Sequence, residues 1–165
     1  MVDAHGRALA GLDVEALAVG GIRVRGDLVD DGLLRLALRH RRARQRVTVA
    51  CGGHPLPFLV RADGSVDTCG RAGTLLGCFP EPALHEEVLD MHPGDAVVLY
   101  TDGVTEARKG SNVMGEAGLR AALVRAAGGS ASEIADAIEQ AALDFQDGDA
   151  RDDIAIVVLK IPPAS

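Results

Sequence analysis

Aromatic side chains are scarce in this sequence, and long apolar runs and a basic excess are missing altogether. Only 2% of the 165 residues are aromatic, so Val, Leu, Ile and Ala must build the core. No apolar run approaches the length of a membrane span, and the N-terminus lacks the basic and apolar regions of a signal peptide. The net charge of −7 argues against a nucleic-acid-binding surface. We therefore expect a cytoplasmic protein that has neither a membrane nor a nucleic acid as its partner.

Cysteines are also few, and they are widely spaced. Cys51, Cys69 and Cys78 form no CxxC pair. This spacing disfavours both a disulfide framework and a zinc knuckle. We expect buried free thiols in a reducing compartment.

The composition changes near residue 46. Residues 1–46 hold nine arginines against six acidic residues, whereas residues 47–165 hold eight basic residues against eighteen acidic ones and all seven prolines. We expect residues 1–46 to be a basic, weakly specified leader that precedes the folded domain. Residues 32–46 could instead form a basic amphipathic helix that binds a partner or an anionic surface.

From residue 47 onward, strand signals alternate with turn signals, and helical spacing follows. Ser130 and Glu133 are spaced for a capping box at the start of the second helix. The order of elements predicts an α+β fold, in which two helices pack against a mostly antiparallel sheet. The predicted elements are a strand at 47–51, a hairpin over 57–69 with its turn at 62–65, strands at 84–91 and 96–101, helices at 115–128 and 130–145, and a strand at 154–161.

Carboxylates stand at the ends of two apolar strands. Asp102-Gly103 follows one of them, and Asp152-Asp153 precedes the other. Carboxylates held at strand ends suit Mg²⁺ or Mn²⁺, and a glycine lets a ligand or its water approach the backbone closely. Two such ions would activate a bridging water and hold a phosphoryl group for in-line attack. The alternative is that Asp102-Gly103 is a helix cap or turn and that Asp152-Asp153 is an ordinary polar loop.

Five stretches, taken in order over residues 47–160, resemble the motifs of one family. VTVACGGHPLPFLV is similar to a strand–AGHPP–strand segment, and GTLLGCF to a G-x-P-L-G stretch, with Leu75 where proline is commoner. MHPGDAVVLYTDGVTEAR matches an L-x-x-G-D-x-L-x-L-Y-T-D-G-V-T-E-A-R segment nearly residue for residue. MGEAGLRAALV and ARDDIAIVVLK resemble the next helix and the closing strand, with Ala155 replacing the usual threonine. The family is that of the bacterial PP2C-like serine/threonine phosphatases of the SpoIIE/RsbU group.

The resemblance implies an α-β-β-α sandwich that uses two Mn²⁺ or Mg²⁺ ions to hydrolyse phosphoserine or phosphothreonine. It implies that Asp102 and Asp152 are catalytic metal ligands, that Gly103 keeps the backbone close to the metal, and that Asp153 orients a ligand or water. The implied substrate is a phosphorylated protein, namely an anti-sigma-factor antagonist in partner-switching control of transcription. His54 would be a structural turn residue.

The resemblance covers only the C-terminal portion of the family's domain. The family's N-terminal half normally supplies a GGDxxD strand and a DxxGHG turn, whose aspartates complete the two-metal site. GDLVDD resembles the first motif only weakly, with Asp27, Asp30 or Asp31 as the matching residues, and the second motif is absent. We therefore expect a truncated member with an incomplete metal site, and an exposed apolar sheet face that favours self-association. The alternative function is that of a catalytically inactive phosphatase remnant that acts as a protein-binding module.

Overall fold

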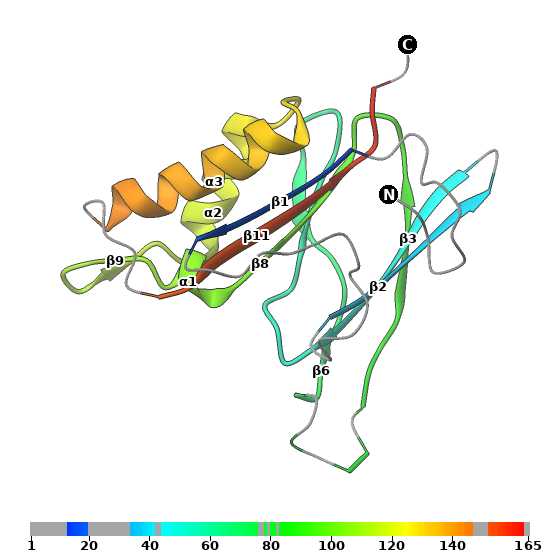
Figure 1. The fold of residues 1–165 in the computed structure, drawn as a ribbon, viewed down its shortest axis with the longest axis horizontal. Coiled ribbons are helices and arrows are strands. Elements are labelled where there is room, and N and C mark those ends of the chain that lie inside the picture. The colour runs from blue at the N-terminus through cyan, green and yellow to red at the C-terminus, as the bar shows by residue number, and fades with distance from the viewer. Residues whose placement is uncertain are drawn as a thin grey trace.

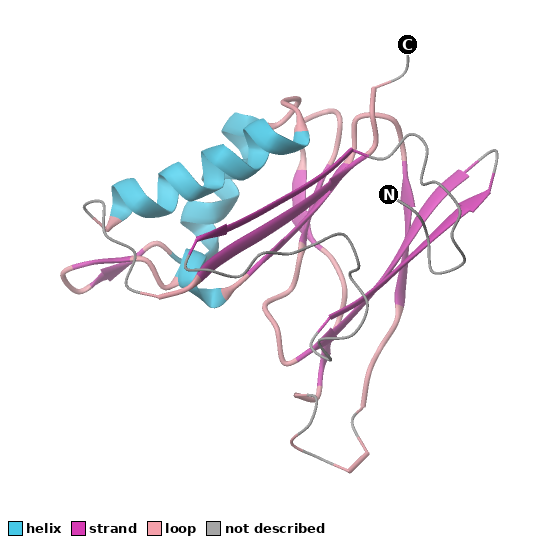
Figure 2. Ribbon diagram, in the orientation of Figure 1, coloured by secondary structure: helices cyan, strands magenta, loops and turns pink. Residues whose placement is uncertain are grey.

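Two β-sheets face each other, and two helices cover the outer face of the larger sheet (Figures 1 and 2). The described part of the chain therefore has three layers, in the order helix, sheet, sheet. The predicted α+β fold with mostly antiparallel pairing is confirmed. This computed structural model describes residues 13–19, 34–41, 44–75, 78, 80–81, 83–146 and 152–163.

The larger sheet has five strands, and all neighbouring strands in it are antiparallel. Its central strand is buried along its whole length, because one face lies against the helices and the other against the second sheet. A continuous apolar run is the sequence pattern expected of such a strand. In sheet order the strands are β1 (Asp13–Val19), β11 (Ile154–Lys160), β8 (Ala96–Tyr100), β4 (Phe58–Val60) and β5 (Val66–Thr68).

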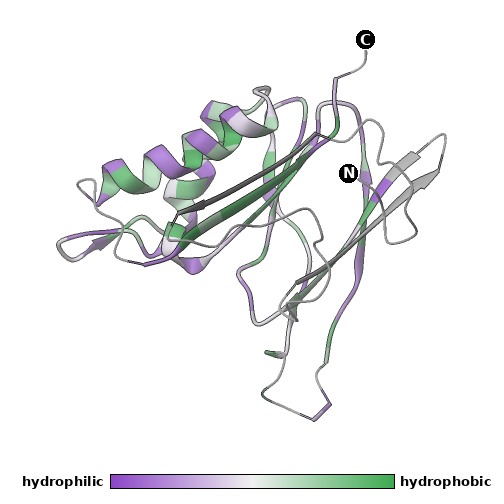
Figure 3. Cartoon of the chain, in the orientation of Figure 1, coloured by the Kyte–Doolittle hydropathy of each residue, from purple (hydrophilic) through white to green (hydrophobic). Residues whose placement is uncertain are grey.

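The helices α2 (Gly115–Ala126) and α3 (Ala131–Phe145) pack on the outer face of this sheet, and α3 contacts β11 and β1 (Figure 1). In α3 the buried residues Ile134, Ile138 and Ala142 recur every four positions, which places them on one face of the helix. Figure 3 shows this division as alternating hydrophobic and hydrophilic patches along the helix, beside the largely hydrophobic β11. No helix among the described residues combines the length and the apolarity that crossing a bilayer requires.

The predicted capping box at the start of α3 is present. The Ser130 hydroxyl accepts the Glu133 backbone N–H at 3.2 Å, and the Glu133 carboxylate accepts the Ser130 N–H at 2.7 Å. Each bond satisfies a backbone donor that the first helical turn would otherwise leave without a partner. The N–H of Ser130 also lowers the pKa of Glu133.

The smaller sheet is centred on β3, which pairs antiparallel with β2 and β7 and parallel with β6. Its strand β3 confirms the predicted strand at 47–51, and β4 and β5 of the larger sheet confirm the predicted hairpin over 57–69. The strand predicted at 84–91 is present as β7 but begins only at Glu87. The strands of the smaller sheet are β2 (Leu34–Arg41), β3 (Arg44–Gly52), β6 (Ala72–Gly73) and β7 (Glu87–Met91).

The helix considered for residues 32–46 is wrong, because β2 and the start of β3 occupy this stretch as an antiparallel pair. Leucine recurs there at every second position, which is the period of a strand. The register sets Leu36 opposite Val49 and Leu38 opposite Val47. The division of the chain at residue 46 stays a prediction, although β3 crosses that residue.

An apolar cluster between the two sheets holds them together. Two of the three free cysteines, Cys51 and Cys69, are buried in it, whereas Cys78 is exposed. Burial raises the pKa of the Cys69 thiol to about 12, so this thiol stays protonated and unreactive. The cluster consists of Val47, Val49, Cys51, Leu59, Cys69, Leu89, Met91, Val97, Leu99, Leu159 and Ile161.

The outer face of the smaller sheet is mixed in character, as far as the structure describes it. Arg46 and Asp90 form an ion pair at 2.7 Å on the exterior of β3 and β7, and Val88 is 57% exposed beside them. An apolar outer face was expected from a sandwich that lacks its second helical layer, and the described part of this face does not have that character. Self-association through this sheet stays a prediction.

Three short elements connect β8 to α2. A single helical turn, α1 (Asp102–Thr105), is followed by a hairpin of β9 (Arg108–Lys109) and β10 (Asn112–Val113). Strands of two residues are too short to show an alternating pattern, so the sequence does not predict them. Gly110 forms the hairpin turn with a φ of +63°, a conformation that favours glycine.

A buried carboxylate, Asp95, fastens the turn before β8 to the end of β4. It is only 2% exposed and forms an ion pair with Arg61 at 2.7 Å. It also accepts the backbone N–H groups of Ala62 at 3.0 Å and His92 at 2.9 Å. Burial opposes ionisation of Asp95, but the His92 N–H and the Arg61 guanidinium outweigh it and lower the pKa of this carboxyl.

We expect Asp95→Ala to lower the free energy of unfolding by about 2 to 4 kcal/mol, because Arg61 and the backbone N–H groups of Ala62 and His92 lose their buried acceptor. Since the pKa of Asp95 is lowered on folding, its contribution is full above about pH 4 and is lost as the pH falls through the lowered pKa. Urea unfolding at several pH values measures both effects. The exposed Asp67 is the control, and an Asp67→Ala change as damaging as Asp95→Ala would contradict this role for Asp95.

The chain's single tyrosine, Tyr100, offers a second test of the core. Its hydroxyl is buried and has no hydrogen-bond partner among the described residues, and its ring stacks on Phe58 with centroids 5.9 Å apart. Burial, and secondarily the charge of Glu116, raises the pKa of Tyr100 to about 12.

We expect the ultraviolet absorbance of the phenolate to develop near pH 12 in the folded protein, but near pH 10 in the denatured protein. Because folding raises this pKa, the free energy of unfolding should fall as the pH rises from about 10 towards 12. Tyr100→Phe should remove both the absorbance change and this part of the pH dependence. A phenolate signal near pH 10 in the folded protein would show that the ring is not buried as described.

Candidate active site

The two aspartate-bearing segments, about fifty residues apart in sequence, meet at one end of the larger sheet. β8 and β11 are antiparallel neighbours, and Tyr100 at the end of β8 lies opposite Ile156 near the start of β11. Asp102 comes two residues after Tyr100, and Asp152 and Asp153 lie just before β11. The strand pairing therefore brings the two predicted half-sites to the same place.

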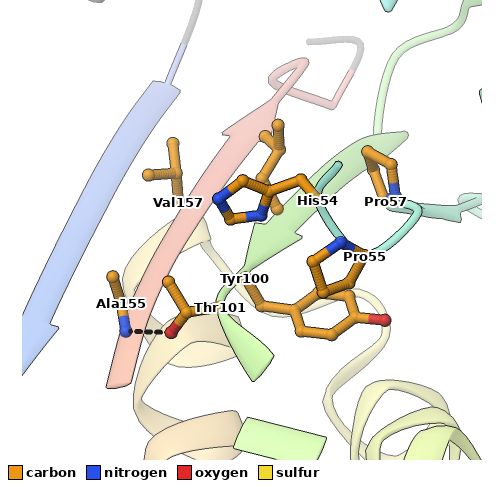
Figure 4. A pocket seen from close by; sticks show the side chains of 8 residues that line it. His54, Pro55, Pro57, Tyr100, Thr101, Ala155 and Val157 are labelled. Carbon is orange, nitrogen blue, oxygen red and sulfur yellow. Dashed lines mark hydrogen bonds between the residues drawn. The ribbon is translucent and has the colours of Figure 1, made fainter. Parts of the chain in front are cut away.

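The Thr101 side chain joins these segments through hydrogen bonds. Its hydroxyl donates to the Asp153 carbonyl at 2.7 Å and accepts the Ala155 N–H at 2.9 Å. The Thr101 N–H also donates to the Ala155 carbonyl at 3.0 Å. We call these three bonds the Thr101 clamp, and Figure 4 shows the bond between Thr101 and the Ala155 N–H as a dashed line.

Gly103 lies directly against the backbone of the other segment. A Cβ atom at this position would come 2.4 Å from the Asp153 carbonyl oxygen and 3.4 Å from the Asp152 carbonyl carbon. The distance of 2.4 Å is much shorter than van der Waals contact, so only glycine fits without movement of the backbone. The Asp153 backbone thus fills the space beside Gly103. The closeness of Gly103 to a metal ion stays a prediction.

We call the place where the end of β8 meets the start of β11 the joint. The three carboxylates at this joint, those of Asp102, Asp152 and Asp153, are all exposed. Asp102 begins α1, and its carbonyl accepts the Glu106 N–H at 2.7 Å, while the Asp152 carboxylate accepts the Asp153 N–H at 2.8 Å. Exposed carboxylates on a rigid strand end are donors of the kind that Mg²⁺ and Mn²⁺ prefer. Within the described ranges, however, no group of three or more His, Cys, Asp or Glu residues is placed to hold a metal ion.

The carboxylates at the joint therefore have the right chemistry for metal ligands. The described residues, however, supply too few of them for a complete metal site. Asp27, Asp30 and Asp31, which the sequence suggests as further ligands, lie outside the described residues. The metal and catalytic roles of Asp102, Gly103, Asp152 and Asp153 stay predictions.

A mostly apolar pocket of about 150 Å³ opens beside the Thr101 clamp (Figure 4). It is bounded by the ends of β8 and β11 and by the loop between β3 and β4. Sequence reasoning assigned His54 only a structural turn role and did not predict this pocket, since the lining comes from three separate stretches of sequence. The lining residues are His54, Pro55, Pro57, Leu99, Tyr100, Thr101, Ala155 and Val157.

Solved structures of PP2C-type phosphatase domains share this fold. The phosphatase domain of SpoIIE from Bacillus subtilis (Mn presoaked) superposes with a TM-score of 0.62 at 13% identity, covering 100% of this chain and 94% of that one. A longer SpoIIE structure from the same organism, the PP2C phosphatase domain with a fragment of the regulatory domain, gives 0.58 at 20% identity and covers 71% of this chain. The fold is therefore that of the PP2C-type phosphatases, as the sequence resemblance implied.

The family assignment comes from the sequence. The family model for stage II sporulation protein E (SpoIIE) matches residues 34–162, and the chain belongs to this family. The RsbU and RsbW domains of Rv1364c from Mycobacterium tuberculosis match with a TM-score of 0.57 at 25% identity over 74% of this chain. The chain spans about a third of that structure and of the longer SpoIIE structure, at 34% and 35% of their lengths. No curated protein matches the sequence significantly.

We expect Gly103→Ala to lower the free energy of unfolding by about 1 to 3 kcal/mol, because the new methyl group must push the Asp153 backbone away. Gly110→Ala is the matched control. Its Cβ would meet nothing within 4 Å, so its cost is only that of a positive φ, roughly 1 kcal/mol.

Backbone amide exchange distinguishes the two variants more sharply than stability does. In Gly103→Ala the Ala155 amide should lose protection, because its acceptor Thr101 moves with the joint. In Gly110→Ala that amide should exchange as in the unsubstituted protein. Unchanged protection of Ala155 in Gly103→Ala would show that the two segments are not packed as tightly as described.

Proposed function

We propose that this chain is a metal-dependent protein serine/threonine phosphatase domain that hydrolyses a phosphorylated protein. The observation that carries the proposal is the joint between β8 and β11. There, two segments with SpoIIE-family motifs present exposed carboxylates at the ends of two paired strands. The family assignment supports hydrolysis of a phosphoprotein as the reaction. An anti-sigma-factor antagonist in partner-switching regulation is the substrate that this assignment favours.

In this proposal Asp102 and Asp152 bind the metal, and Asp153 orients a ligand or a water molecule. Two bound Mn²⁺ or Mg²⁺ ions would supply an activated water and would neutralise the charge on the phosphoryl group. The chain's own contribution is to hold the carboxylates still. The Thr101 clamp and the contact of Gly103 with Asp153 support this role, because they bind the two segments into one unit.

The described donors make up only part of a two-metal site, so the proposal includes further ligands. We propose that these ligands come from outside the described residues or from a second copy of this chain. We also propose that the phosphatase portion begins before residue 47, because the family match starts at residue 34 and β2 pairs with β3 along its length.

The test is hydrolysis of a phosphothreonine peptide and of an aryl phosphate by the purified chain with Mn²⁺ or Mg²⁺, with and without EDTA. We expect Asp102→Asn to lower kcat/KM by about 100-fold or more, since a metal ion supplies several kcal/mol of transition-state stabilisation. Asp67→Asn is the matched control. Asp67 is an exposed aspartate on β5, an edge strand of the same sheet that is separated from β8 by β4.

The outcomes separate two functions. Activity that needs metal and is lost in Asp102→Asn, but not in Asp67→Asn, supports the phosphatase. A folded protein that hydrolyses neither substrate at any metal concentration contradicts catalysis by this chain. That result would leave the protein-binding module as the function to pursue.

A further inference from the structure

We propose that Thr101 is a positioning residue of the site, and that its hydroxyl holds the Asp152-Asp153 segment in place beside Asp102. The inference rests on the proposed function, and it adds a residue that contributes no carboxylate. Thr101 lies between the last residue of β8 and the first residue of α1. Its own side chain therefore stands at the point where the regular strand pairing ends.

The first support is that the Thr101 hydroxyl is used both as a donor and as an acceptor. It donates to the Asp153 carbonyl at 2.7 Å and accepts the Ala155 N–H at 2.9 Å. A hydroxyl has one proton to donate, so the bond to Asp153 uses all of its donor capacity. Together with the bond from its own N–H to Ala155, Thr101 holds the opposite strand at three atoms.

The second support is that the clamp continues the pairing of the strands past the last regular pair. That pair is Tyr100 and Ile156, and the next residues on the two strands are Thr101 and Ala155. The side chain thus supplies a bond that the backbone of β8 does not provide, and it reaches as far as Asp153. Without the hydroxyl, the segment that carries Asp152 and Asp153 would lose the side-chain bonds from Thr101 to Asp153 and Ala155.

The third support is that the Asp153 backbone is fixed from two sides. Its carbonyl oxygen accepts the Thr101 hydroxyl on one side and lies against Gly103 on the other. Its N–H is bound by the Asp152 carboxylate at 2.8 Å. The position of this peptide relative to Asp102 therefore depends on Thr101 and Gly103, the two residues that flank Asp102.

These contacts imply that position 101 needs a side chain with a hydroxyl group. Valine has nearly the shape of threonine but lacks the hydroxyl, so Thr101→Val removes both hydroxyl bonds at little cost in packing. Serine keeps the hydroxyl and loses only a methyl group. If Thr101 positions the site through its hydroxyl, serine should preserve metal binding and valine should not.

The experiment measures Mn²⁺ binding to the purified full chain by the electron paramagnetic resonance signal of free Mn²⁺, without any need for turnover. Residues that orient metal ligands typically contribute 10- to 100-fold in affinity. We expect Thr101→Val to raise the Mn²⁺ Kd about 10-fold or more, and Thr101→Ser to change it by no more than about twofold. Thr68→Val, an exposed threonine on β5, is the matched control and should leave the Kd unchanged.

Each variant is first shown to be folded by urea unfolding. If Thr101→Val does not fold, Thr101→Ala replaces it in the comparison with Thr101→Ser. Rescue by serine is the decisive readout, because a role confined to packing would not follow the hydroxyl.

The outcomes distinguish this inference from the function on which it rests. If the unsubstituted chain binds Mn²⁺ through Asp102 and Thr101→Val binds it equally well, the positioning role is overturned and the proposed function stands. If the unsubstituted chain binds no Mn²⁺, or if Asp102→Asn binds it unchanged, the proposed function fails and the positioning role fails with it.

Discussion

The antiparallel pairing of β8 with β11 is the contact on which the core and the site both depend. One face of this pair lies against α2 and α3 and the other against the smaller sheet, so the pair contributes to both apolar clusters. The pair is also fastened at both ends. At one end Gly94 and Asp95 exchange backbone hydrogen bonds with Ile161, each at 2.9 Å, and at the other end the Thr101 clamp binds Asp153 and Ala155.

These hydrogen bonds at both ends of the strand pair explain how the aspartates can lie at solvent-exposed strand ends and still be attached to a fixed backbone. Side chains at a solvent-exposed strand end lack the packing that fixes a buried residue, so their positions depend on the backbone beneath them. Here that backbone is held by the hydroxyl of Thr101 and by the close approach of Gly103. The polar atoms that fix the site are therefore not the atoms proposed to do its chemistry. Such an arrangement suits a function in which carboxylates must be ready before a ligand arrives.

Family membership and geometry support the proposed phosphatase in different ways. The SpoIIE family assignment bears on the class of reaction, and the fold shared with PP2C-type domains bears on the scaffold. The geometry adds that the two motif-bearing segments form one joint, beside a small apolar pocket. The described donors are fewer than two-metal chemistry needs, so the proposal depends on ligands from elsewhere, and metal binding is the property that most directly decides it.

Local signals in the sequence were sufficient for the elements whose pattern extends over many residues. The unbroken apolar run of β8 and the capping box of α3 depend on neighbours within a few positions, and both are present. The stretch at 32–46 was misjudged because consecutive and alternate leucines fit a helix and a strand equally well, and only the pairing of β2 with β3 decides between them. The sequence alone was enough to predict the α+β class and the family, and it suggested the candidate metal ligands. The contacts of Thr101 and Gly103 with the Asp153 backbone became visible only in the folded structure, because strand register between segments about fifty residues apart sets these contacts and no local sequence pattern encodes it.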